Sequence, residues 1–233
     1  MNIAVIPARG GSQRIPRKNI KLFHGLPIIA YAIKAALASD AIHEVFVSTD
    51  DEEIAEIAIS FGAQVPWLRS KELSDDYVST ISVMKDAVVR LNLSGLENIC
   101  CIYPTVPLLK PIFLSDALKL LEEGNWNYVF SGTLATTSPQ RLFSLGANME
   151  VELLYPEYEL TRTQDIEKFY GDAGQFYWGR KSSWESGLPI FSSFSTIFEI
   201  PRVSAVDIDT LEDWHYAETL FKAMNEKLLE IEQ

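Results

Sequence analysis

A cluster of positively charged residues near the N-terminus is the first feature that could do chemistry. Its members are Arg9, Arg14, Arg17, Lys18 and Lys21. The whole chain carries 20 Lys and Arg against 32 Asp and Glu, a formal net charge of −12, so cations gathered in one place indicate an anion site. Gly10 and Gly11 lie in the same stretch and let the backbone turn its N–H groups toward a ligand. We predict a phosphate-binding loop over 8–19, with a solvated basic turn as the alternative.

Two common nucleotide-binding motifs are absent from this loop. It contains neither the Walker A pattern GxxxxGK[ST] nor the dinucleotide pattern GxGxxG, which argues against a P-loop ATPase and a Rossmann dehydrogenase. His24, His43 and His215 are scattered along the chain and have no partners at catalytic spacing. Ser–His–Asp chemistry is therefore not supported.

A pair of carboxylates near the C-terminus is the second chemical feature. Asp207 and Asp209 are separated by one residue, and on an extended segment that spacing places both on one face, where they can share a cation. Mg²⁺ is commonly bound through one or two carboxylates together with substrate phosphates. Alternatively, Asp209 is the N-cap of the following helix, with Glu212 completing a capping box. The two roles are compatible.

The elements that must position these residues alternate between strand and helix patterns. Strands are expected at 2–7, 44–48, 63–68, 99–103 and 128–131, and helices at 27–39, 51–62, 79–92 and 112–123. Alternation of this kind predicts an α/β fold with a Rossmann-like, doubly wound and mostly parallel sheet. Ligands of such sheets bind at the carboxyl ends of the strands. We therefore expect the site in the loops after Pro7, Ser48 and Tyr103.

The alternation breaks at 133–170. Residues 142–154 resemble a hairpin that turns through Gly146, Ala147 and Asn148, and 155–169 is polar and irregular. A long insertion is usually functional, and an arm that docks on a second subunit is a common use. Strand patterns return at 175–178 and 195–200, and a terminal helix is expected at 211–229. We predict one domain over 1–233 with a dimerisation arm, and a homodimer.

The composition limits the partners of the chain. A protein this acidic repels nucleic acid and anionic membranes except where its cations are concentrated. No apolar run is long enough to cross a bilayer, and 1–7 has a strand pattern with no signal-peptide features. Cys100 and Cys101 are adjacent on an expected strand, which makes a disulfide between them geometrically poor. We predict a cytoplasmic protein with no nucleic-acid or membrane partner.

The cationic loop resembles the signature of the sugar-acid cytidylyltransferases, the family that includes the CMP-sialic acid synthetases. The usual form is A-R-x-x-S-K-x-x-P-x-K-N, matched here by Ala8, Arg9, Ser12, Pro16, Lys18 and Asn19. The resemblance implies a fold of the nucleotide-diphospho-sugar transferase type and a loop that holds the triphosphate of CTP. The residues expected on the triphosphate are Ala8, Arg9, Gly10, Gly11, Ser12, Arg14, Lys18 and Asn19, with Arg9 and Lys18 also catalytic.

Gln13 departs from the signature, because the family has a lysine there. The neighbouring Arg14 is our candidate for supplying the missing cation.

Further motifs extend the resemblance over most of the chain. Ser48-Thr49-Asp50 matches the family's S-T-D, although Asp50 would serve equally as the cap of a helix starting at Asp51. The segment from Arg69 through Glu72, Leu73 and Asp76 resembles the one that lies against cytosine and ribose, which implies Arg69, Val78 and Thr80 beside the nucleoside. The family's D-x-D implies that Asp207 and Asp209 bind Mg²⁺. No side chain stands out as the general base, and Asp209 and a metal-bound hydroxide are the candidates.

The sugar side departs from the sialic acid pattern. Tyr103 and Leu109 replace the glutamine and arginine of Q-P-T-S-P-L-R, and Gly171 and Ala173 replace the arginine and asparagine of R-x-N-G-A-I-Y. A site that hydrogen-bonds particular hydroxyls strongly rejects analogues that lack them. Replacing several of these hydrogen-bonding residues together therefore implies that the substrate is a different stereoisomer and not sialic acid. The D-A-G-Q-F-Y-W run resembles the branch of the family that acts on pseudaminic acid, a nine-carbon sugar acid. The expected sugar contacts are Tyr103, Asp172, Gln175 and Tyr177.

The resemblance implies a nucleotidyltransferase in which the anomeric hydroxyl of the sugar attacks the α-phosphate of CTP. Pyrophosphate would leave, and the CMP-pseudaminic acid would serve a bacterial surface glycan or flagellin. The nearest alternative is the same reaction on sialic, legionaminic or Kdo-type acids. An enzyme using UTP or GTP and a non-catalytic nucleotide-binding module are the remaining alternatives.

Overall fold

The structure is a computed structural model that describes residues 1–92, 94–95 and 97–231, with side chains as far as Asn225. Its centre is a six-stranded sheet in the order β10-β6-β9-β5-β1-β4. The strands are β1 (Asn2–Pro7), β4 (Glu44–Ser48), β5 (Asn98–Ile102), β6 (Tyr128–Leu134), β9 (Tyr170–Arg180) and β10 (Ser195–Glu199). β1 is parallel to β4 and β5, β10 is parallel to β6, and β9 is antiparallel to both of its neighbours. The predicted mostly parallel α/β sheet is confirmed.

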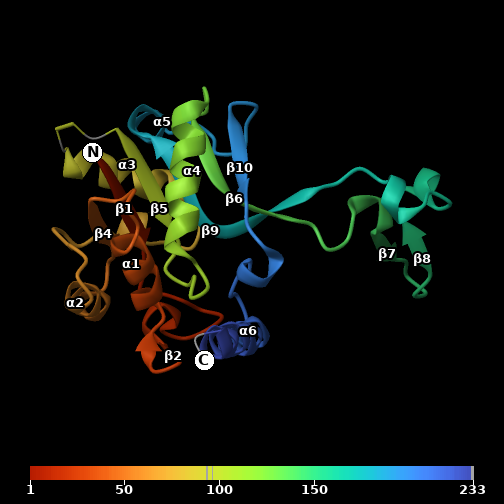
Figure 1. The fold of residues 1–233 in the computed structure, drawn as a ribbon, viewed down its shortest axis with the longest axis horizontal. Coiled ribbons are helices and arrows are strands. Elements are labelled where there is room, and N and C mark those ends of the chain that lie inside the picture. Colours follow the sequence, from red (N-terminus) through yellow and green to blue (C-terminus); the bar gives the residue numbers. More distant parts are fainter. Residues whose placement is uncertain (93, 96, 232–233) are drawn as a thin grey trace.

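Helices cover both faces of this sheet (Figure 1). They are α1 (Ile29–Leu37), α2 (Glu52–Ser60), α3 (Thr80–Leu91), α4 (Pro111–Glu123) and α5 (Lys181–Ser186). β1 shows why two layers form, since its apolar side chains alternate between faces. Ala4 and Ile6 are fully buried with residues of α1, α2 and α4, whereas Ile3 and Val5 pack with α3 and α5.

A third, smaller core lies under α6 (Leu211–Ile231), the helix that ends the chain. Ile15 from the cationic loop is fully buried there with Ile208 and Trp214. This core therefore joins the cationic loop to the segment that carries the two aspartates. No helix in the described part of the chain is long and apolar enough to span a membrane.

Two element predictions need correction. Residues 63–68 form no continuous strand and make only two isolated parallel bridges, Phe46 with Gln64 and Thr49 with Leu68. The helix predicted from Pro27 begins at Ile29, because Pro27 belongs to a short hairpin of β2 (Leu22–Phe23) and β3 (Leu26–Pro27). Six 3-10 turns complete the described elements: η1 (Lys18–Ile20), η2 (Lys71–Leu73), η3 (Pro139–Arg141), η4 (Pro156–Tyr158), η5 (Thr163–Asp165) and η6 (Arg202–Ser204).

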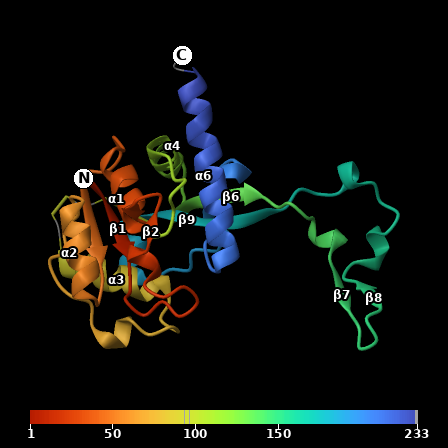
Figure 2. The same cartoon turned by 90° about the horizontal axis from the view of Figure 1, so that it is seen from below.

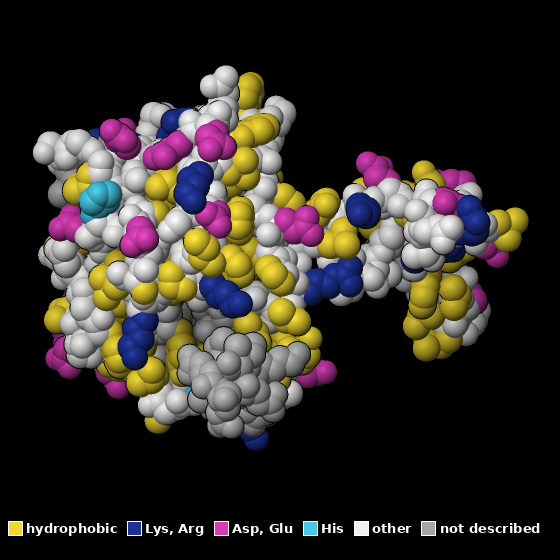
Figure 3. Space-filling model, in the orientation of Figure 1, with side chains coloured by type: hydrophobic (Ala, Val, Ile, Leu, Met, Phe, Trp, Pro, Cys, Tyr) yellow, Lys and Arg dark blue, Asp and Glu magenta, His cyan; other side chains and the backbone are white. Residues whose placement is uncertain are grey.

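The insertion between β6 and β9 projects away from the body as an arm (Figures 1 and 2). Its tip holds the predicted hairpin, formed by β7 (Phe143–Leu145) and β8 (Val151–Leu153). The Gly146 N–H donates to the Glu150 carbonyl at 2.8 Å and closes the turn. Hydrophobic side chains gather on this tip (Figure 3), and Phe143, Leu145 and Val151 are each more than half exposed.

Candidate active site

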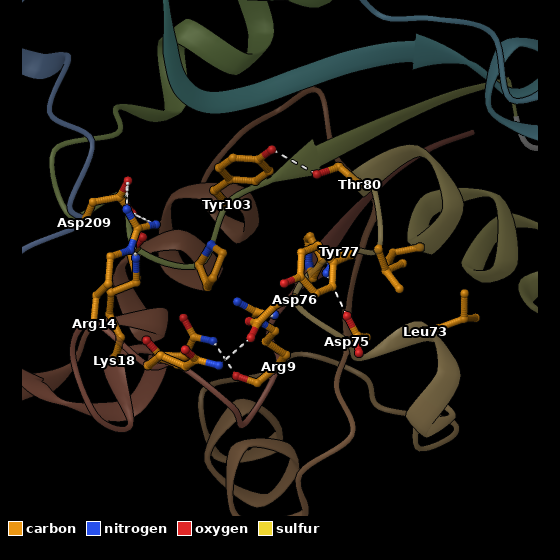
Figure 4. Close-up of a pocket in the computed structure, with 18 of the residues that line it drawn as sticks. Arg9, Arg14, Lys18, Leu73, Asp75, Asp76, Tyr77, Thr80, Tyr103 and Asp209 are labelled. Carbon is orange, nitrogen blue, oxygen red and sulfur yellow. Dashed lines mark hydrogen bonds and ion pairs between the residues drawn. The ribbon is translucent and has the colours of Figure 1, made fainter.

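A cavity of about 740 Å³ lies at the carboxyl ends of β1 and β5. Many of the residues predicted from sequence line it: Arg9, Ser12, Arg14, Lys18, Asn19, Arg69, Val78, Thr80, Tyr103, Asp207 and Asp209. Figure 4 shows Arg14, Lys18 and Asp209 on one side of it and Thr80 and Tyr103 on another. Segments 190 residues apart in sequence therefore meet in one place, as the Lys18–Ile208 contact illustrates.

Three predicted residues of the cationic loop shape it without lining the cavity. Ala8 is fully buried, and its N–H donates to the Ser48 carbonyl at 2.9 Å. The Gly10 N–H donates to the Asp50 carboxylate at 3.0 Å, so it does not point toward a ligand as predicted. Gly11 lies in open space outside the lining. Asn19 braces the loop from within, donating its side-chain amide to the Arg9 carbonyl at 2.8 Å.

Arg17 fastens the loop to the start of α2. Its backbone is left-handed, with φ of 55°, and its guanidinium donates to Asp51 and Glu53. The hydrogen bond from Arg17 is the main cause of a lowered pKa at Asp51. Asp51 also accepts from the Ile54 N–H at 3.0 Å, so it is Asp51, and not Asp50, that caps α2. Asp50 instead serves the loop through Gly10.

Every loop cation that lines the cavity is held by an acceptor of the protein itself. Arg14 makes two bonds to Asp209, at 2.8 and 2.7 Å. Lys18 donates to the Ile208 carbonyl at 2.6 Å and lies 3.5 Å from Asp209. Arg9 pairs with Asp76. An anionic ligand at these cations would therefore compete with acceptors of the chain itself.

Gln13, the departure from the family signature, also bonds to Asp76. Its amide therefore holds the segment 75–78 over the cavity. Arg14 lines the cavity together with Lys18. Its role as the substitute for the missing lysine stays a prediction.

Asp207 and Asp209 face the cavity together, and their environments differ. Asp209 carries the bonds to Arg14 and Lys18, whereas no described side chain donates a hydrogen bond to the Asp207 carboxylate. Asp207 is exposed to the cavity, and partial desolvation by the surrounding atoms, followed by the charge of Asp209, raises the pKa of its carboxyl group. A carboxylate pair with an unpartnered member fits a divalent cation that also binds substrate phosphates.

The capping alternative for Asp209 is wrong. The Thr210 hydroxyl accepts from the Asp213 N–H at 3.2 Å, and the Asp213 carboxylate accepts from the Thr210 N–H at 2.7 Å. This reciprocal pair caps α6 and uses the side chain of neither Asp209 nor Glu212, although the Asp209 N–H also donates to Asp213 at 3.1 Å. The Asp209 carboxylate is thereby left for the cavity.

A tyrosine wall, formed by Tyr103 on the lining and Tyr177 packed against it, closes one side of the cavity. The Tyr103 hydroxyl lies 3.0 Å from the Thr80 hydroxyl. The ring of Tyr177 lies behind Tyr103 with centroids 5.2 Å apart, and its hydroxyl donates to Asp172 at 2.6 Å. Burial is the main cause of a raised pKa at both tyrosines, so both present protonated hydroxyls at neutral pH.

An irregularity in β9 makes the Asp172–Tyr177 contact possible. These residues are five apart, so a regular strand would place them on opposite faces. In the structure, Tyr177 pairs with Phe130 and Asp172 pairs with Gly132 of β6. Because those partners are two residues apart, Tyr177 and Asp172 share a face. Ser131, between them on β6, accepts from the N–H groups of the two displaced residues 175 and 176, each at 3.2 Å.

Gln175 lies away from the cavity. Its side chain is 1% exposed, and its amide donates to the carbonyl of Ser204. Of the four expected sugar contacts, only Tyr103 lines the cavity, with Tyr177 and Asp172 directly behind it.

Several lining residues were not predicted from the sequence, among them Tyr77 and Thr105. Tyr77 is 96% exposed although it is aromatic, and Figure 4 shows it between Asp76 and Thr80. The available signal was an aromatic residue directly after Asp75 and Asp76, in a stretch too polar to be core.

Comparison with known proteins identifies the family to which the chain is similar. The family model described as cytidylyltransferase matches residues 3–226. The chain is 40% identical over 227 residues to a pseudaminic acid cytidylyltransferase of Campylobacter jejuni, covering 97% of this chain and 98% of that one. It is 31% identical to a CMP-N,N'-diacetyllegionaminic acid synthase of Legionella pneumophila, covering 99% of this chain and 97% of that one.

A solved structure shares the fold. A CMP:2-keto-3-deoxy-manno-octonic acid synthetase complexed with CTP superposes with a TM-score of 0.70, covering 96% of this chain and 99% of that one. At 17% identity this likeness speaks for the fold alone.

Proposed function

This chain belongs to the cytidylyltransferase family, and we propose that it transfers CMP from CTP to the anomeric hydroxyl of pseudaminic acid, releasing pyrophosphate. The choice of sugar acid rests on the 40% identity to the Campylobacter jejuni enzyme over nearly the whole chain. The observation that carries the chemistry is that loop cations, a carboxylate pair and a tyrosine wall share one cavity. The legionaminic acid relative, at 31% identity, makes that sugar acid the second candidate.

The nucleotide half of the proposed site is the loop side of the cavity. Arg9, Arg14 and Lys18 would exchange their carboxylate partners for phosphate oxygens, a more favourable pairing because each phosphate offers several charged acceptors. Ser12 and Asn19 line the same side. Arg69 would sit under the nucleoside with Val78 and Thr80. Its side chain is buried, and burial lowers its pKa while the charge of Asp50 opposes that shift.

Asp207 and Asp209 would hold Mg²⁺. When bound, the ion would supply positive charge to the phosphate oxygens as negative charge develops on them. Asp207 already lacks a partner among the described side chains, and Asp209 would become available when the triphosphate takes Arg14 and Lys18. The carboxylate pair and the cations would thus change partners together.

The proposed reaction is an in-line displacement. The anomeric oxygen of the sugar forms a bond to the α-phosphorus, the bond from that phosphorus to the pyrophosphate oxygen breaks, and the hydroxyl proton leaves to a base. Arg9, Arg14 and Lys18 would stabilise the charge that accumulates on the leaving pyrophosphate. The chain needs no covalent nucleophile, because positioning and charge neutralisation account for most of the rate in such transfers.

The sugar acid would lie against the tyrosine wall. Tyr103 faces the cavity. Behind it, the Tyr177 hydroxyl donates to the Asp172 carboxylate, which fixes the orientation of that hydroxyl. Hydroxyls held in this way reject sugars whose substituents do not match them. We propose Tyr103, Tyr177 and Asp172 as the sugar-selective group.

The arm is proposed to dock on a second copy of the chain and form a homodimer. Exposed apolar side chains at its tip support this proposal, because an isolated hairpin does not bury enough surface to be stable alone. We place the reaction in the cytoplasm, where CTP is made.

Product formation tests the proposal. The protein is incubated with CTP, Mg²⁺ and, separately, pseudaminic, legionaminic, sialic and Kdo-type acids, and the products are identified by mass. We expect CMP-pseudaminic acid as the main product, no turnover with UTP or GTP, and no turnover after chelation of the metal. A main product with another sugar acid would overturn the choice of sugar, and turnover in a chelator would overturn the Mg²⁺ site.

A further inference from the structure

The buried amide of Gln175 lies between the two halves of the site and touches neither substrate region. We infer that Gln175 is a positioning residue: its backbone fixes Tyr103 on the sugar side, and its side chain fixes the segment that carries Asp207. The part concerning Asp207 rests on the proposed metal site.

The backbone of Gln175 sets the position of Tyr103. β5 ends at Ile102, and the Tyr103 N–H then donates to the Gln175 carbonyl at 2.9 Å. The N–H of Gln175 donates in turn to the Ser131 hydroxyl at 3.2 Å. Pairing therefore continues one residue beyond the strand, and it holds Tyr103 where its ring meets Tyr177.

The side chain of Gln175 holds the segment that leads to Asp207. Its amide nitrogen donates to the carbonyl of Ser204, the last residue of η6, and both residues are 1% exposed. Asp207 follows three residues later, after a stretch with no helix or strand. Fixing Ser204 therefore limits where the Asp207 carboxylate can lie.

The backbone next to Gln175 lies close to Asp207. Gly174 is left-handed, with φ of 61°, and a Cβ at this position would lie 3.7 Å from the carboxyl carbon of Asp207. The irregular part of β9 thus lies beside the aspartate segment at Gly174 and is bonded to it through the Gln175 side chain. The link to Tyr103 runs through the Gln175 backbone, so a change of its side chain alone is expected to act on the aspartate segment and to leave the tyrosine wall in place.

Two buried polar atoms at this junction decide which substitution is suitable for testing the positioning role. Among the described residues, Gln175 Oε1 and Ser204 Oγ have no hydrogen-bond partner. A buried polar atom without a partner costs about 1–3 kcal/mol. Methionine has a similar length and no amide, so Gln175→Met removes the unpartnered Oε1 and also takes the donor away from the Ser204 carbonyl. One unpartnered buried oxygen replaces another, so the variant is compatible with folding while it loses the bond to Ser204.

Gln175→Met is therefore the test, with Mn²⁺ as the metal probe. We measure Mn²⁺ affinity by electron paramagnetic resonance in the presence of CTP, amide hydrogen exchange of 202–209 without ligands, and steady-state kinetics. We expect Mn²⁺ to bind at least about 10-fold more weakly, as is typical when a residue supporting a metal ligand is lost. Exchange in 202–209 rises, kcat falls, and the KM for the sugar acid stays within about twofold.

Ser39→Ala is the matched control. Ser39 is buried, its hydroxyl pairs with Ser115 at 3.0 Å, and it accepts from the Ala41 N–H, away from the cavity. This variant also loses buried hydrogen bonds, and we expect it to leave Mn²⁺ affinity and exchange in 202–209 unchanged. If Gln175→Met does not fold, Gln175→Asn replaces it, because the shorter amide cannot reach Ser204 and the same losses are expected.

Two results would overturn the inference. A sugar acid KM raised tenfold or more, with Mn²⁺ affinity and exchange unchanged, would show that Gln175 contacts the sugar instead. No change in any of the three readouts would show that the residue positions nothing. If the unaltered protein binds no Mn²⁺ with CTP, the proposed metal site fails, and hydrogen exchange in 202–209 alone then decides the role of Gln175.

Discussion

At the level of single residues, each cation of the loop that lines the cavity has a partner within the chain. Arg9 holds Asp76, and Arg14 and Lys18 hold Asp209. Carboxylate and phosphate oxygens compete for the same donors. We therefore expect nucleotide binding to be an exchange of partners, in which the displaced aspartates determine part of the affinity.

Asp76 tests this exchange in isolation. We predict that Asp76→Asn binds pyrophosphate about 3–10-fold more tightly, because Arg9 no longer leaves an internal carboxylate to reach the ligand. Pyrophosphate carries no ribose or base, so any contact of Asp76 with the nucleoside does not enter. Calorimetric titration measures the affinity. Asp75→Asn, which removes the same charge from the neighbouring position, is the control, and unchanged or weaker binding by Asp76→Asn contradicts the exchange.

Asp209 tests the metal proposal. Replacing Asp209 by Asn is expected to lower kcat at least about 100-fold, because a direct ligand should matter at least as much as the residues that support one. Far-ultraviolet circular dichroism should be unchanged, since α6 is capped by Thr210 and Asp213. Near-normal turnover in this variant would be incompatible with Asp209 as a metal ligand.

At the scale of elements, local sequence signals predicted those parts that local physics decides. β1, β4 and the helix α3 between Ser79 and Asn92 were predicted closely, because apolar runs and capping residues define them within a few residues. The irregular pairing of β9 was not predicted. Strict alternation cannot show that Ser131 of a neighbouring strand supports a displaced stretch, so Gln175 was expected on the sugar when it lies in the interior.

The loop and α2 form a second element-scale unit, joined by Arg17. We predict that Arg17→Leu lowers the free energy of unfolding by about 1 kcal/mol, as for a partly exposed ion pair, and raises the KM for CTP because the loop loses its anchor. Chemical denaturation measures the first quantity and steady-state kinetics the second.

The stabilisation of the fold by Arg17 depends on pH, and the pKa of Asp51 gives the direction of that dependence. Arg17 lowers the pKa of Asp51, so the stabilisation is complete above the ordinary value of 3.8 and is lost as pH falls through the lowered pKa. The difference in the free energy of unfolding between the unaltered protein and Arg17→Leu should therefore shrink below about pH 4. A difference that grows in acid would contradict the assignment of Asp51 as the partner.

At the scale of the whole molecule, the arm is the feature that a single chain leaves unexplained. Its insertion and its hairpin followed from the sequence because Gly146 and its neighbours form a local turn signal. What the tip contacts depends on a second molecule, and no pattern within one chain specifies it.

Three substitutions at the tip test the dimer. We predict that Phe143→Ser, Leu145→Ser and Val151→Ser together convert a dimer to a monomer in light scattering, because they remove the exposed apolar surface available for docking. Ile59→Ser, a change at an equally exposed apolar residue on α2, should leave the mass unchanged. A monomeric parent protein, or a triple variant that remains dimeric, would contradict the role of the arm.

We propose that this cavity selects pseudaminic acid for the transfer of CMP. The most direct measurement is a competition in one vessel, with CTP, Mg²⁺ and equal concentrations of pseudaminic acid and sialic acid, followed by quantifying the two CMP-sugars at early times. Their ratio equals the ratio of kcat/KM for the two acids. We predict CMP-pseudaminic acid in excess by at least about 100-fold, as expected for a site that hydrogen-bonds particular substituents. Equal amounts, or an excess of CMP-sialic acid, would contradict the account.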